Sequence, residues 1–439
     1  MNRVLLLGAG LVTRPLVRYL LEKPDLQLTI ATRTVSKAEK LIDGHPQGTP
    51  LQLLVDDEKT LSRLIAEHDL TISLLPYTFH VKVANLCIKH HKHLITTSYV
   101  SPAMKALDQP ARDAGILILN EIGLDPGIDH MSAMRVIHDV NDRGGKVTAF
   151  SSYCGGLPAP EANTNPWGYK FSWSPRAVVM AGKNPGKFLR DGQVVDIPGP
   201  ALFGTYETVQ VPDAGAFEGY TNRDCLGYVE LYGLHEAKLM FRGTLRYPGW
   251  CDTMKAISTL GYPDDTERAD LKGKTFADLM RSMVPGSEGR DLKAAVASHL
   301  GIAVDANPVE RMEWLGLFSD EPLPDAPSTM DVLVARMDEK MPYEPGERDM
   351  IVLHHDFQAA FPDHREHITS TLVDYGIPHG DSAMSRTVSL PAAVATKLLL
   401  EGAINLTGVH IPVEPSVYNP VLDELEGMKI ACKERTERL

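Results

Sequence analysis

A glycine-containing turn near the start of the chain has the residue types of a dinucleotide-binding site. Residues 4–7 form an apolar run, and Gly8 and Gly10 follow it at once. In a strand–turn–helix unit the first glycine allows the tight bend, the second lets phosphate oxygens approach the backbone, and the N–H groups of the helix attract the anion. Thr13 stands where a third glycine is usual, so the match is partial. A glycine-rich turn without a ligand is the alternative.

Arg33 favours one dinucleotide over the other. It follows a predicted strand over 27–32, at the place where an acidic residue would bind the 2′-hydroxyl of an NAD ribose. Arg33 and Thr34 can instead hold a 2′-phosphate through charge-assisted hydrogen bonds. The pattern therefore favours NADP(H). The alternative is a solvated arginine ahead of a helix that has Ser36 as its N-cap.

Polar side chains also follow two later apolar runs. Ser98 and Tyr99 come directly after 93–97, and Asp125 lies in an Asp-Pro-Gly turn after 115–120. Because the carboxyl ends of parallel strands meet at one edge of a sheet, we expect these side chains and the glycine turn to line one crevice. Capping of the next helix is the alternative role for Asp125.

The elements that must position these residues alternate regularly over 1–122. Short apolar runs take turns with amphipathic stretches, which predicts a parallel sheet with helices on both faces. Predicted strands cover 3–7, 27–32, 51–55, 70–75, 93–97 and 115–120. Predicted helices lie near 11–22, 36–43, 58–67, 78–90, 102–113 and 127–143.

The rest of the chain predicts a second domain. A strand at 146–156 precedes a stretch rich in Gly, Pro and aromatic residues, and 253–340 is mostly helical. We therefore expect an α/β protein with a Rossmann-type dinucleotide-binding domain, 1–126, and a second α/β domain, 127–439, that carries a helical insertion over 253–340. We expect the C-terminal segment to pack back on the first domain.

Composition excludes several classes of function. The chain is 43% hydrophobic and 23% charged, which is typical of a soluble globular protein. Its net charge of −13 argues against nucleic-acid binding. No apolar stretch reaches the roughly 18 residues that span a membrane. Because the first strand begins at Arg3, we expect no signal or transit peptide and a cytoplasmic location.

Neither cysteines nor histidines predict a metal site. The five cysteines are scattered without CxxC spacing, which indicates reduced thiols and no zinc site. The cluster His90, His91 and His93 has residue types that bind nickel or zinc. Its place at a predicted helix end favours a solvated turn instead. We therefore predict no metal.

Longer motifs resemble the glutamate-forming saccharopine dehydrogenase family. In chain order they are GAGLVTRP, SLLPYTFH, TTSYVSPAM, NEIGLDPGIDH, SYCGGLPAPE, YKFSWSP, NRD and RGTLRY. The resemblance covers almost the whole chain, and GLDPGIDH and YCGGLPAPE are its most specific parts. The segment ATRT resembles the NADP-dependent, fungal-type members.

The resemblance implies an oxidoreductase of the lysine aminoadipate pathway. Such an enzyme interconverts L-saccharopine with L-glutamate and 2-aminoadipate 6-semialdehyde by hydride transfer between NADP(H) and an imine or secondary amine. The resemblance also implies a homodimer formed through the second domain, which would bind substrate. We expect no nucleic-acid and no membrane partner.

The resemblance also implies which residues of this chain form the binding and catalytic site. The family's saccharopine contacts correspond to Ser98, Tyr99, Asp125, Arg223, Thr244, Leu245 and Arg246. Its cofactor contacts correspond to Gly8, Gly10, Leu11, Val12, Thr13, Arg33, Thr34, Leu75, Leu124, Asp125, Pro126 and Trp173. Arg223 and Arg246 can each grip a substrate carboxylate, although surface salt bridges are the alternative. Imine formation and hydrolysis need proton transfers, for which Asp125, Tyr99 and Cys154 are candidates. A small buried hydrophobe is the alternative for Cys154.

Two other classes of protein remain open. One is a related imine reductase, such as a carboxynorspermidine or homospermidine synthase-like enzyme. Its polyamine substrates would not call for two arginines. The other is a non-catalytic NADP(H)-binding regulator, which would need neither Tyr99 nor Asp125.

Overall fold

The computed structural model describes all 439 residues, and these form two compact units. Unit 1 comprises 1–146 and 380–434, and unit 2 comprises 147–379 and 435–439. The predicted boundary at 126/127 thus precedes the observed one. Residues 380–434 fall in the range that we assigned to the second domain, with the expectation that the C-terminal segment packs back on the first; they are part of unit 1. None of the helices combines the length and the apolar character needed to cross a bilayer.

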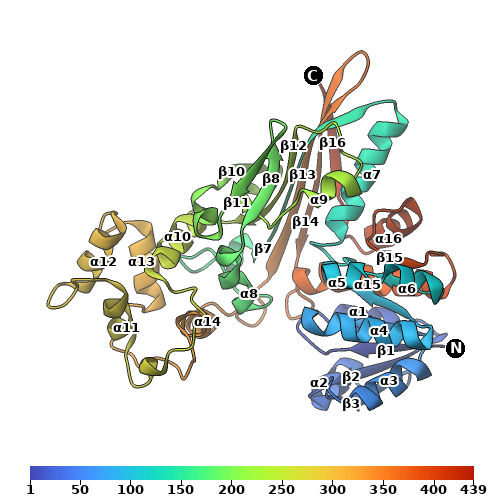
Figure 1. The fold of residues 1–439 in the computed structure, drawn as a ribbon, viewed down its shortest axis with the longest axis horizontal. Coiled ribbons are helices and arrows are strands. Elements are labelled where there is room, and N and C mark those ends of the chain that lie inside the picture. Colours follow the sequence, from blue (N-terminus) through green and yellow to red (C-terminus); the bar gives the residue numbers. More distant parts are fainter. The chain divides into compact units, whose positions relative to one another are not determined.

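Unit 1 is built on a seven-stranded parallel sheet (Figure 1). Its strand order is β15-β6-β5-β4-β1-β2-β3, so the order reverses between β1 and β4. Ligands of such sheets bind beyond the carboxyl ends of the strands at this switch point. The strands are β1 (Asn2–Leu7), β2 (Leu26–Thr32), β3 (Gly48–Gln52), β4 (Leu70–Ser73), β5 (His93–Thr96), β6 (Leu117–Leu119) and β15 (Gly408–His410).

Helices cover this sheet, and side chains such as Leu5 and Leu7 of β1 are fully buried beneath them. They are α1 (Arg14–Leu21), α2 (Val35–Ile42), α3 (Glu58–Glu67), α4 (His80–His90), α5 (Pro102–Lys105), α6 (Asp108–Asp113), α7 (Ile128–Asp142), α15 (Ala383–Leu400) and α16 (Pro415–Gly427). The single helix predicted over 102–113 is two short helices. Pro110 lacks the N–H that a continuous helix would need there, so the helix breaks before it.

The far end of the chain completes unit 1. Helix α15 packs against α1, and α16 packs against α7 and α15. Between α7 and α16, Nδ1 of His138 lies 2.7 Å from the hydroxyl of Tyr418, and Arg135 pairs with Asp423 at 2.7 Å. This contact ties α7 to unit 1, which explains why the boundary falls after the helix rather than before it.

Unit 2 contains a nine-stranded mixed sheet. Its main path runs β10-β11-β12-β7-β13-β14-β16, and β8 joins β12 to β9. Strands β7 and β12 pair in parallel, whereas β11–β12 and β13–β14 are antiparallel. The strands are β7 (Lys146–Pro158), β8 (Gly186–Arg190), β9 (Gln193–Ile197), β10 (Glu207–Val211), β11 (Gly215–Thr221), β12 (Leu239–Arg246), β13 (Asp349–Ala360), β14 (Arg365–Tyr375) and β16 (Lys433–Arg438).

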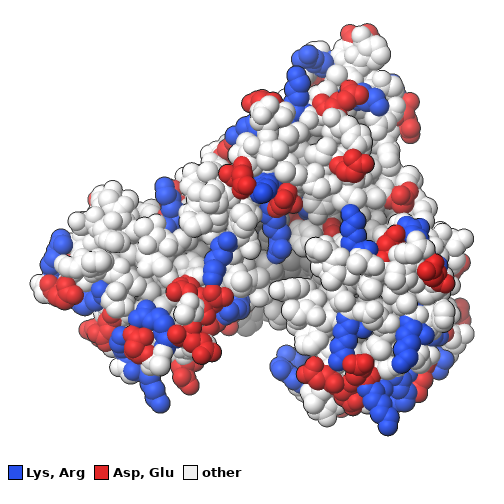
Figure 2. Space-filling view, viewed as in Figure 1, with Lys and Arg blue, Asp and Glu red and all other residues white.

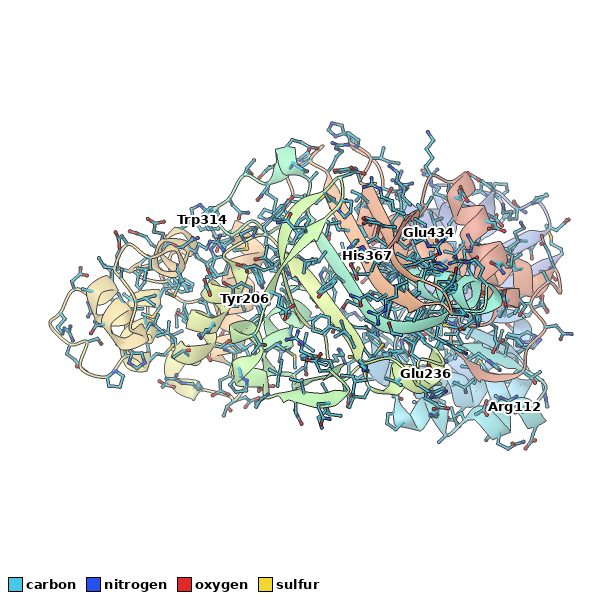
Figure 3. The ribbon with its side chains drawn as sticks, turned by 90° about the horizontal axis from the view of Figure 1, so that it is seen from above. Arg112, Tyr206, Glu236, Trp314, His367 and Glu434 are labelled. Carbon is cyan, nitrogen blue, oxygen red and sulfur yellow. The ribbon has the colours of Figure 1, made fainter.

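Most helices of unit 2 fall in the predicted helical stretch, and α11 to α14 gather at one end of the unit (Figure 1). Trp314 of α13 lies at this end, and His367 of β14 lies on the sheet (Figure 3). The helices are α8 (Pro175–Met180), α9 (Gly227–Leu231), α10 (Trp250–Leu260), α11 (Phe276–Met283), α12 (Leu292–Leu300), α13 (Asn307–Leu315) and α14 (Thr329–Lys340). Short 3-10 helices in the two units cover Tyr77–Phe79, Pro160–Ala162, Ala181–Lys183, Gly199–Gly204 and Ala269–Leu271.

Acidic and basic side chains are intermixed on the surface. The chain has 44 Lys and Arg and 57 Asp and Glu residues, and some of both kinds occur side by side on the visible face of the helical end of unit 2 (Figure 2). The same mixture covers the region of α2 and α3 in unit 1 (Figure 2).

Candidate active site

The glycine turn after β1 has an open face. Gly8 has a φ of +109°, and a Cβ there would lie 2.9 Å from the carbonyl oxygen of Leu74, so the fold itself requires this glycine. A Cβ on Gly10, by contrast, would meet no atom within 4 Å. Leu11 beside it is 76% exposed. The space next to Gly10 is what a phosphate needs to approach the backbone.

Thr13 stands at the position of the usual third glycine and forms a side-chain hydrogen bond within the turn. Its side chain is fully buried, and its Oγ1 accepts the N–H of Gly10 at 2.9 Å. Thr13 is also the N-cap residue of α1, but its hydroxyl accepts no N–H from the helix. The first N–H groups of α1 are therefore left for an anion.

Arg33 and Thr34 follow β2 with their polar groups available. The Arg33 side chain is exposed and makes no hydrogen bond or ion pair; only its carbonyl oxygen is used, by the amide of Gln52 at 3.3 Å. Thr34 is the N-cap of α2, and its hydroxyl caps no helix N–H. The N-cap of this helix is thus Thr34 and not Ser36, whereas the exposed Arg33 agrees with a solvated arginine as well as with a phosphate-binding one. A guanidinium, a hydroxyl and a helix N-terminus together fit a 2′-phosphate.

We expect Arg33→Asp to weaken NADPH binding by about 10- to 100-fold, because charge-assisted hydrogen bonds contribute about 1.5–3 kcal/mol. NADH binding should change much less, because it has no 2′-phosphate. Fluorescence titration with both cofactors measures the two dissociation constants. Arg63→Asp is the control, since Arg63 is exposed but pairs with Glu67 on α3. Equal losses for NADPH and NADH in Arg33→Asp would contradict the assignment.

The loops after β5 and β6 bring two predicted residues into contact. The hydroxyl of Tyr99 donates to Oδ1 of Asp125 at 2.7 Å. Helix α7 has Gly127 as its N-cap and no side-chain cap, and the peptide bond between Asp125 and Pro126 is cis. Asp129, not Asp125, accepts the N–H of Gly127, at 2.5 Å. Asp125 therefore faces Tyr99 instead of capping the helix.

His80, at the start of α4, holds the neighbouring Ser98. Its Nε2 lies 2.8 Å from Oγ of Ser98, and its Nδ1 lies 3.0 Å from Oγ of Ser73. Burial lowers the pKa of His80 to about 4, so the ring is neutral at pH 7. No residue spacing singled out His80, although its place just beyond the end of β4 was a usable signal.

We expect His80 to make the protein less stable in mild acid. In the unfolded chain a histidine has a pKa of about 6.5, so the unfolded state binds this proton first as the pH falls. Stability is therefore lost between about pH 6.5 and 4, by about 3 kcal/mol. His80→Gln cannot titrate and should flatten this part of the curve. Urea unfolding between pH 7 and 4.5 measures the slope, with the exposed His235 replaced by glutamine as control. A slope unchanged by His80→Gln would rule this out.

The other unit 1 residues predicted to bind the cofactor lie in the same loops. Leu75 follows β4, Leu124 and Pro126 flank Asp125 in the loop after β6, and Val12 ends the glycine turn. The structure thus places on this sheet edge Gly8, Gly10, Leu11, Val12, Thr13, Arg33, Thr34, Leu75, Ser98, Tyr99, Leu124, Asp125 and Pro126.

In unit 2, Arg246 is a buried cation without a carboxylate partner. It ends β12 and is 4% exposed. Its Nη1 donates to the carbonyl of Leu245 at 2.7 Å, its Nε has no partner, and no acidic side chain pairs with it. Burial by itself acts to lower the pKa of Arg246, but nearby ionisable groups, Tyr220 and Tyr169 first, raise it above its ordinary value. A buried charge of this kind is costly unless an anion meets it.

Aromatic side chains surround the Arg246 guanidinium. Its central carbon lies 5.0 Å from the ring centre of Tyr169 and 5.5 Å from that of Trp250. The indole N–H of Trp250 is buried and has no partner. Trp173, a predicted cofactor contact, donates its indole N–H to the hydroxyl of Tyr169 at 3.3 Å. Tyr169 and Trp250 were not predicted, although Tyr169 begins the motif YKFSWSP and Trp250 follows RGTLRY by three residues.

Two further predicted residues are neighbours on the sheet of unit 2. The register of β7 and β12 places Cys154 opposite Thr244, and Cys154 is buried. Arg223 lies elsewhere, exposed in the loop after β11 with a φ of +59°. Because β11 pairs Glu218 with Arg246, the two arginines lie toward opposite ends of the β11–β12 pair. They cannot grip one carboxylate, but they suit a long substrate with several.

The three histidines of the predicted cluster contact three different groups. The ring of His90 bonds Ser62, that of His91 bonds the carbonyl of Ala114, and that of His93 accepts the N–H of Leu117. His91 is the left-handed C-cap of α4.

A parallel sheet with this strand order and an open glycine turn at its switch point places the protein in the class of dinucleotide-binding proteins. Within that class, the chain belongs to the saccharopine dehydrogenase family. Residues 4–119 match the NADP binding domain of saccharopine dehydrogenase, and residues 123–430 match its C-terminal domain. The predictions of an α/β fold, of NADP(H) and of this family are confirmed.

Full-length relatives carry the same name. Saccharopine dehydrogenase [NADP(+), L-glutamate-forming] of Pyricularia oryzae is 42% identical over 98% of both chains, and that of Saccharomyces cerevisiae is 39% identical over 99% of both. The solved apo structure of the histidine-tagged, L-Glu-forming saccharopine dehydrogenase from Saccharomyces cerevisiae superimposes with a TM-score of 0.91. It is 38% identical and covers 100% of both chains.

Proposed function

We propose that the protein interconverts L-saccharopine with L-glutamate and 2-aminoadipate 6-semialdehyde, using NADP(H). Relatives that carry this enzyme name match nearly the whole chain. The structural observation that carries the proposal is the buried Arg246 guanidinium without an acidic partner, because it calls for an anionic ligand. Saccharopine, with three carboxylates, is such a ligand.

The residues of unit 1 fit NADP(H). The open space at Gly10 and the N-terminus of α1 would hold the pyrophosphate, and Arg33 with Thr34 would hold the 2′-phosphate. When bound, NADP(H) exchanges a hydride with the carbon next to the substrate nitrogen. Conversion of saccharopine consumes NADP⁺ and one water and releases NADPH and a proton.

Substrate carboxylates are assigned to the arginines. Arg246 would bind one carboxylate through its free Nε and its terminal nitrogens, next to Thr244 and Leu245 on β12. Arg223 would bind another from its exposed loop. Ser98, whose hydroxyl is fixed by the neutral ring of His80, would contact the substrate in unit 1.

Proton transfers are assigned to the hydrogen-bonded pair Tyr99 and Asp125. The secondary amine must lose a proton before hydride leaves the neighbouring carbon, and water must lose protons as it attacks the imine. The Asp125 carboxylate can accept such a proton, while the Tyr99 hydroxyl, held at 2.7 Å, orients it. Cys154 is the third candidate, although the reaction requires no covalent thiol step.

The alternatives are not favoured. A carboxynorspermidine has one carboxylate and a homospermidine has none, so neither polyamine calls for both Arg246 and Arg223, whereas saccharopine has three carboxylates. A regulator would have no use for the contact between Tyr99 and Asp125. The family match over 4–119 and 123–430 also covers both units of the chain.

One assay tests the proposal. Oxidation of NADPH is followed at fixed enzyme concentration with L-glutamate and 2-aminoadipate 6-semialdehyde together, and with each omitted. We expect a rate only when both are present. No rate with both substrates would overturn the proposal, and a rate with a diamine in place of glutamate would favour a polyamine enzyme.

We further propose that the protein is a cytoplasmic homodimer, assembled through the second domain. The family resemblance supports this assembly, and the absence of disulfides among the five cysteines suits a reducing compartment. Light scattering after gel filtration should then give twice the chain mass of 48.2 kDa. A monomeric mass at micromolar concentration would overturn the assembly.

A further inference from the structure

Glu121, a residue with no role assigned above, grips the backbone on both sides of Tyr99. Its own N–H donates to the carbonyl of Ser98 at 3.2 Å. Its carboxylate Oε1 accepts the N–H of Val100 at 2.8 Å. The backbone of Glu121 thus holds the residue before Tyr99, and its carboxylate holds the residue after it. Glu121 is itself buried, with 4% of its surface exposed.

The second carboxylate oxygen of Glu121 is held by a helix. Its Oε2 lies 2.7 Å from Nε2 of His130, which is fully buried on α7. Oδ2 of Asp129 lies 3.8 Å from the other ring nitrogen of His130. Asp129 in turn accepts the N–H of Gly127, which closes the loop that contains Asp125. A chain of contacts therefore runs from the backbone at Tyr99 to the end of the Asp125 loop.

The backbone of this loop leaves little freedom. Glu121 has a φ of +57°, a left-handed conformation that non-glycine residues adopt only where their surroundings hold them. The N–H of Gly123 donates to the carbonyl of Pro126 at 3.0 Å, and a Cβ on Gly127 would lie 2.0 Å from the Gly123 carbonyl. The loop after β6, which contains Asp125, is thus compact. Glu121 holds the loop after β5, which contains Tyr99, against it.

We propose that Glu121, supported by His130, is the positioning residue that keeps the Tyr99 hydroxyl on Asp125. The inference rests on the proposed function, because it needs Tyr99 to take part in the reaction. A displacement of about 1 Å at a reacting group costs on the order of 100-fold in rate. Glu121 touches neither substrate nor cofactor in this proposal and acts only through Tyr99.

A double-mutant cycle tests it. Glu121→Ala should lower kcat with saccharopine by roughly 10- to 100-fold and leave the dissociation constant of NADPH unchanged. Glu121→Gln keeps an acceptor for Val100 and should retain kcat within about threefold. In a Tyr99→Phe background, Glu121→Ala should lower kcat by less than about threefold further, because the group that it positions is gone.

A control variant distinguishes an effect on the position of Tyr99 from an effect on the stability of the protein. Glu424→Ala removes a unit 1 carboxylate that accepts from the Tyr19 hydroxyl and from Lys397, and should lower the Tm without changing kcat. If Glu121→Ala does not fold, Glu121→Asp, too short to reach both partners, replaces it in the cycle.

Two outcomes overturn the inference. One is an equal loss of kcat in the wild-type and Tyr99→Phe backgrounds, which indicates a general structural role. The other is full turnover by Tyr99→Phe, which leaves nothing to position. Absence of turnover by the unmodified protein would instead overturn the proposed function.

Discussion

Arg246→Met should remove most saccharopine binding and leave the protein as stable as before, or more stable. Truncating one partner of a buried, hydrogen-bonded charge pair costs about 2–5 kcal/mol, so the KM for saccharopine should rise about 30-fold or more. NADPH binding should not change, because Arg246 is not a predicted contact of the cofactor. Steady-state kinetics and a cofactor titration measure the two effects.

The expected stability is the unusual part of this result. Without substrate, the Arg246 guanidinium is buried with an unpartnered Nε and no carboxylate. Replacing such a charge with an apolar side chain of similar length removes its desolvation cost. Methionine can pack against the rings of Tyr169 and Trp250. The Tm should therefore stay or rise.

Arg336→Met is the matched control. Arg336 is equally buried in unit 2, but it pairs with Glu321 at 2.7 Å and with Glu339 at 3.0 Å and donates to the carbonyl of Leu315. Its replacement should lower the Tm and leave the KM unchanged, the reverse of the Arg246 result. An unchanged KM, or a large fall in Tm, for Arg246→Met would contradict the assignment of Arg246 to a substrate carboxylate.

Asp125→Asn should lower kcat by about 100- to 10,000-fold with little change in Tm. Asparagine keeps an oxygen for the Tyr99 hydroxyl but cannot accept a proton at working pH. A fall of kcat at low pH that is caused by protonation of Asp125 should be absent in Asp125→Asn. Tyr99→Phe should have a smaller effect, because it removes only the group that orients the carboxylate. Rates of saccharopine oxidation between pH 6 and 10 measure both.

Asp57→Asn is the control for the loss of a charge. Asp57 is the N-cap of α3, and hydrogen bonds from Thr60 hold its pKa below the ordinary range. Its replacement should lower the Tm slightly and leave kcat unchanged. Near-normal turnover by Asp125→Asn, Tyr99→Phe and Cys154→Ser alike would exclude an acid–base role for this set of residues.

The sheet of unit 1 was predictable because its strands are short apolar runs separated by amphipathic helices. Strands β1 to β6 overlap the predicted ranges, although β3 begins and ends three residues before the predicted 51–55. Strand β15 was not predicted, because its three residues, Gly408–His410, are too few to show an apolar or alternating pattern. Only their pairing with β6 defines the strand. The boundary between the units escaped prediction for the same reason: the contact of α7 with α16 joins segments far apart in the chain.

At the site, residue types were predictable and partners were not. Gly8 and Gly10 look alike in the sequence, yet one is required by Leu74 and the other faces open space. Nothing in the spacing tells that Arg246 is buried and Arg223 exposed. Glu121 lies inside a quoted motif, but its importance comes from two backbone contacts that exist only once the loops after β5 and β6 meet.

The strand β15 has a consequence for the order of assembly on the ribosome. Unit 1 begins with the first strand of the chain, but its sheet and the cover of α1 are complete only when 380–434 has emerged, after all of 147–379. Until then β6 is an unpaired edge, the kind of strand that templates aggregation. Unit 1 is thus the first unit to start folding and among the last to finish. NADP(H) would therefore stabilise the protein only after 380–434 has been made, and would not guide the early steps of folding.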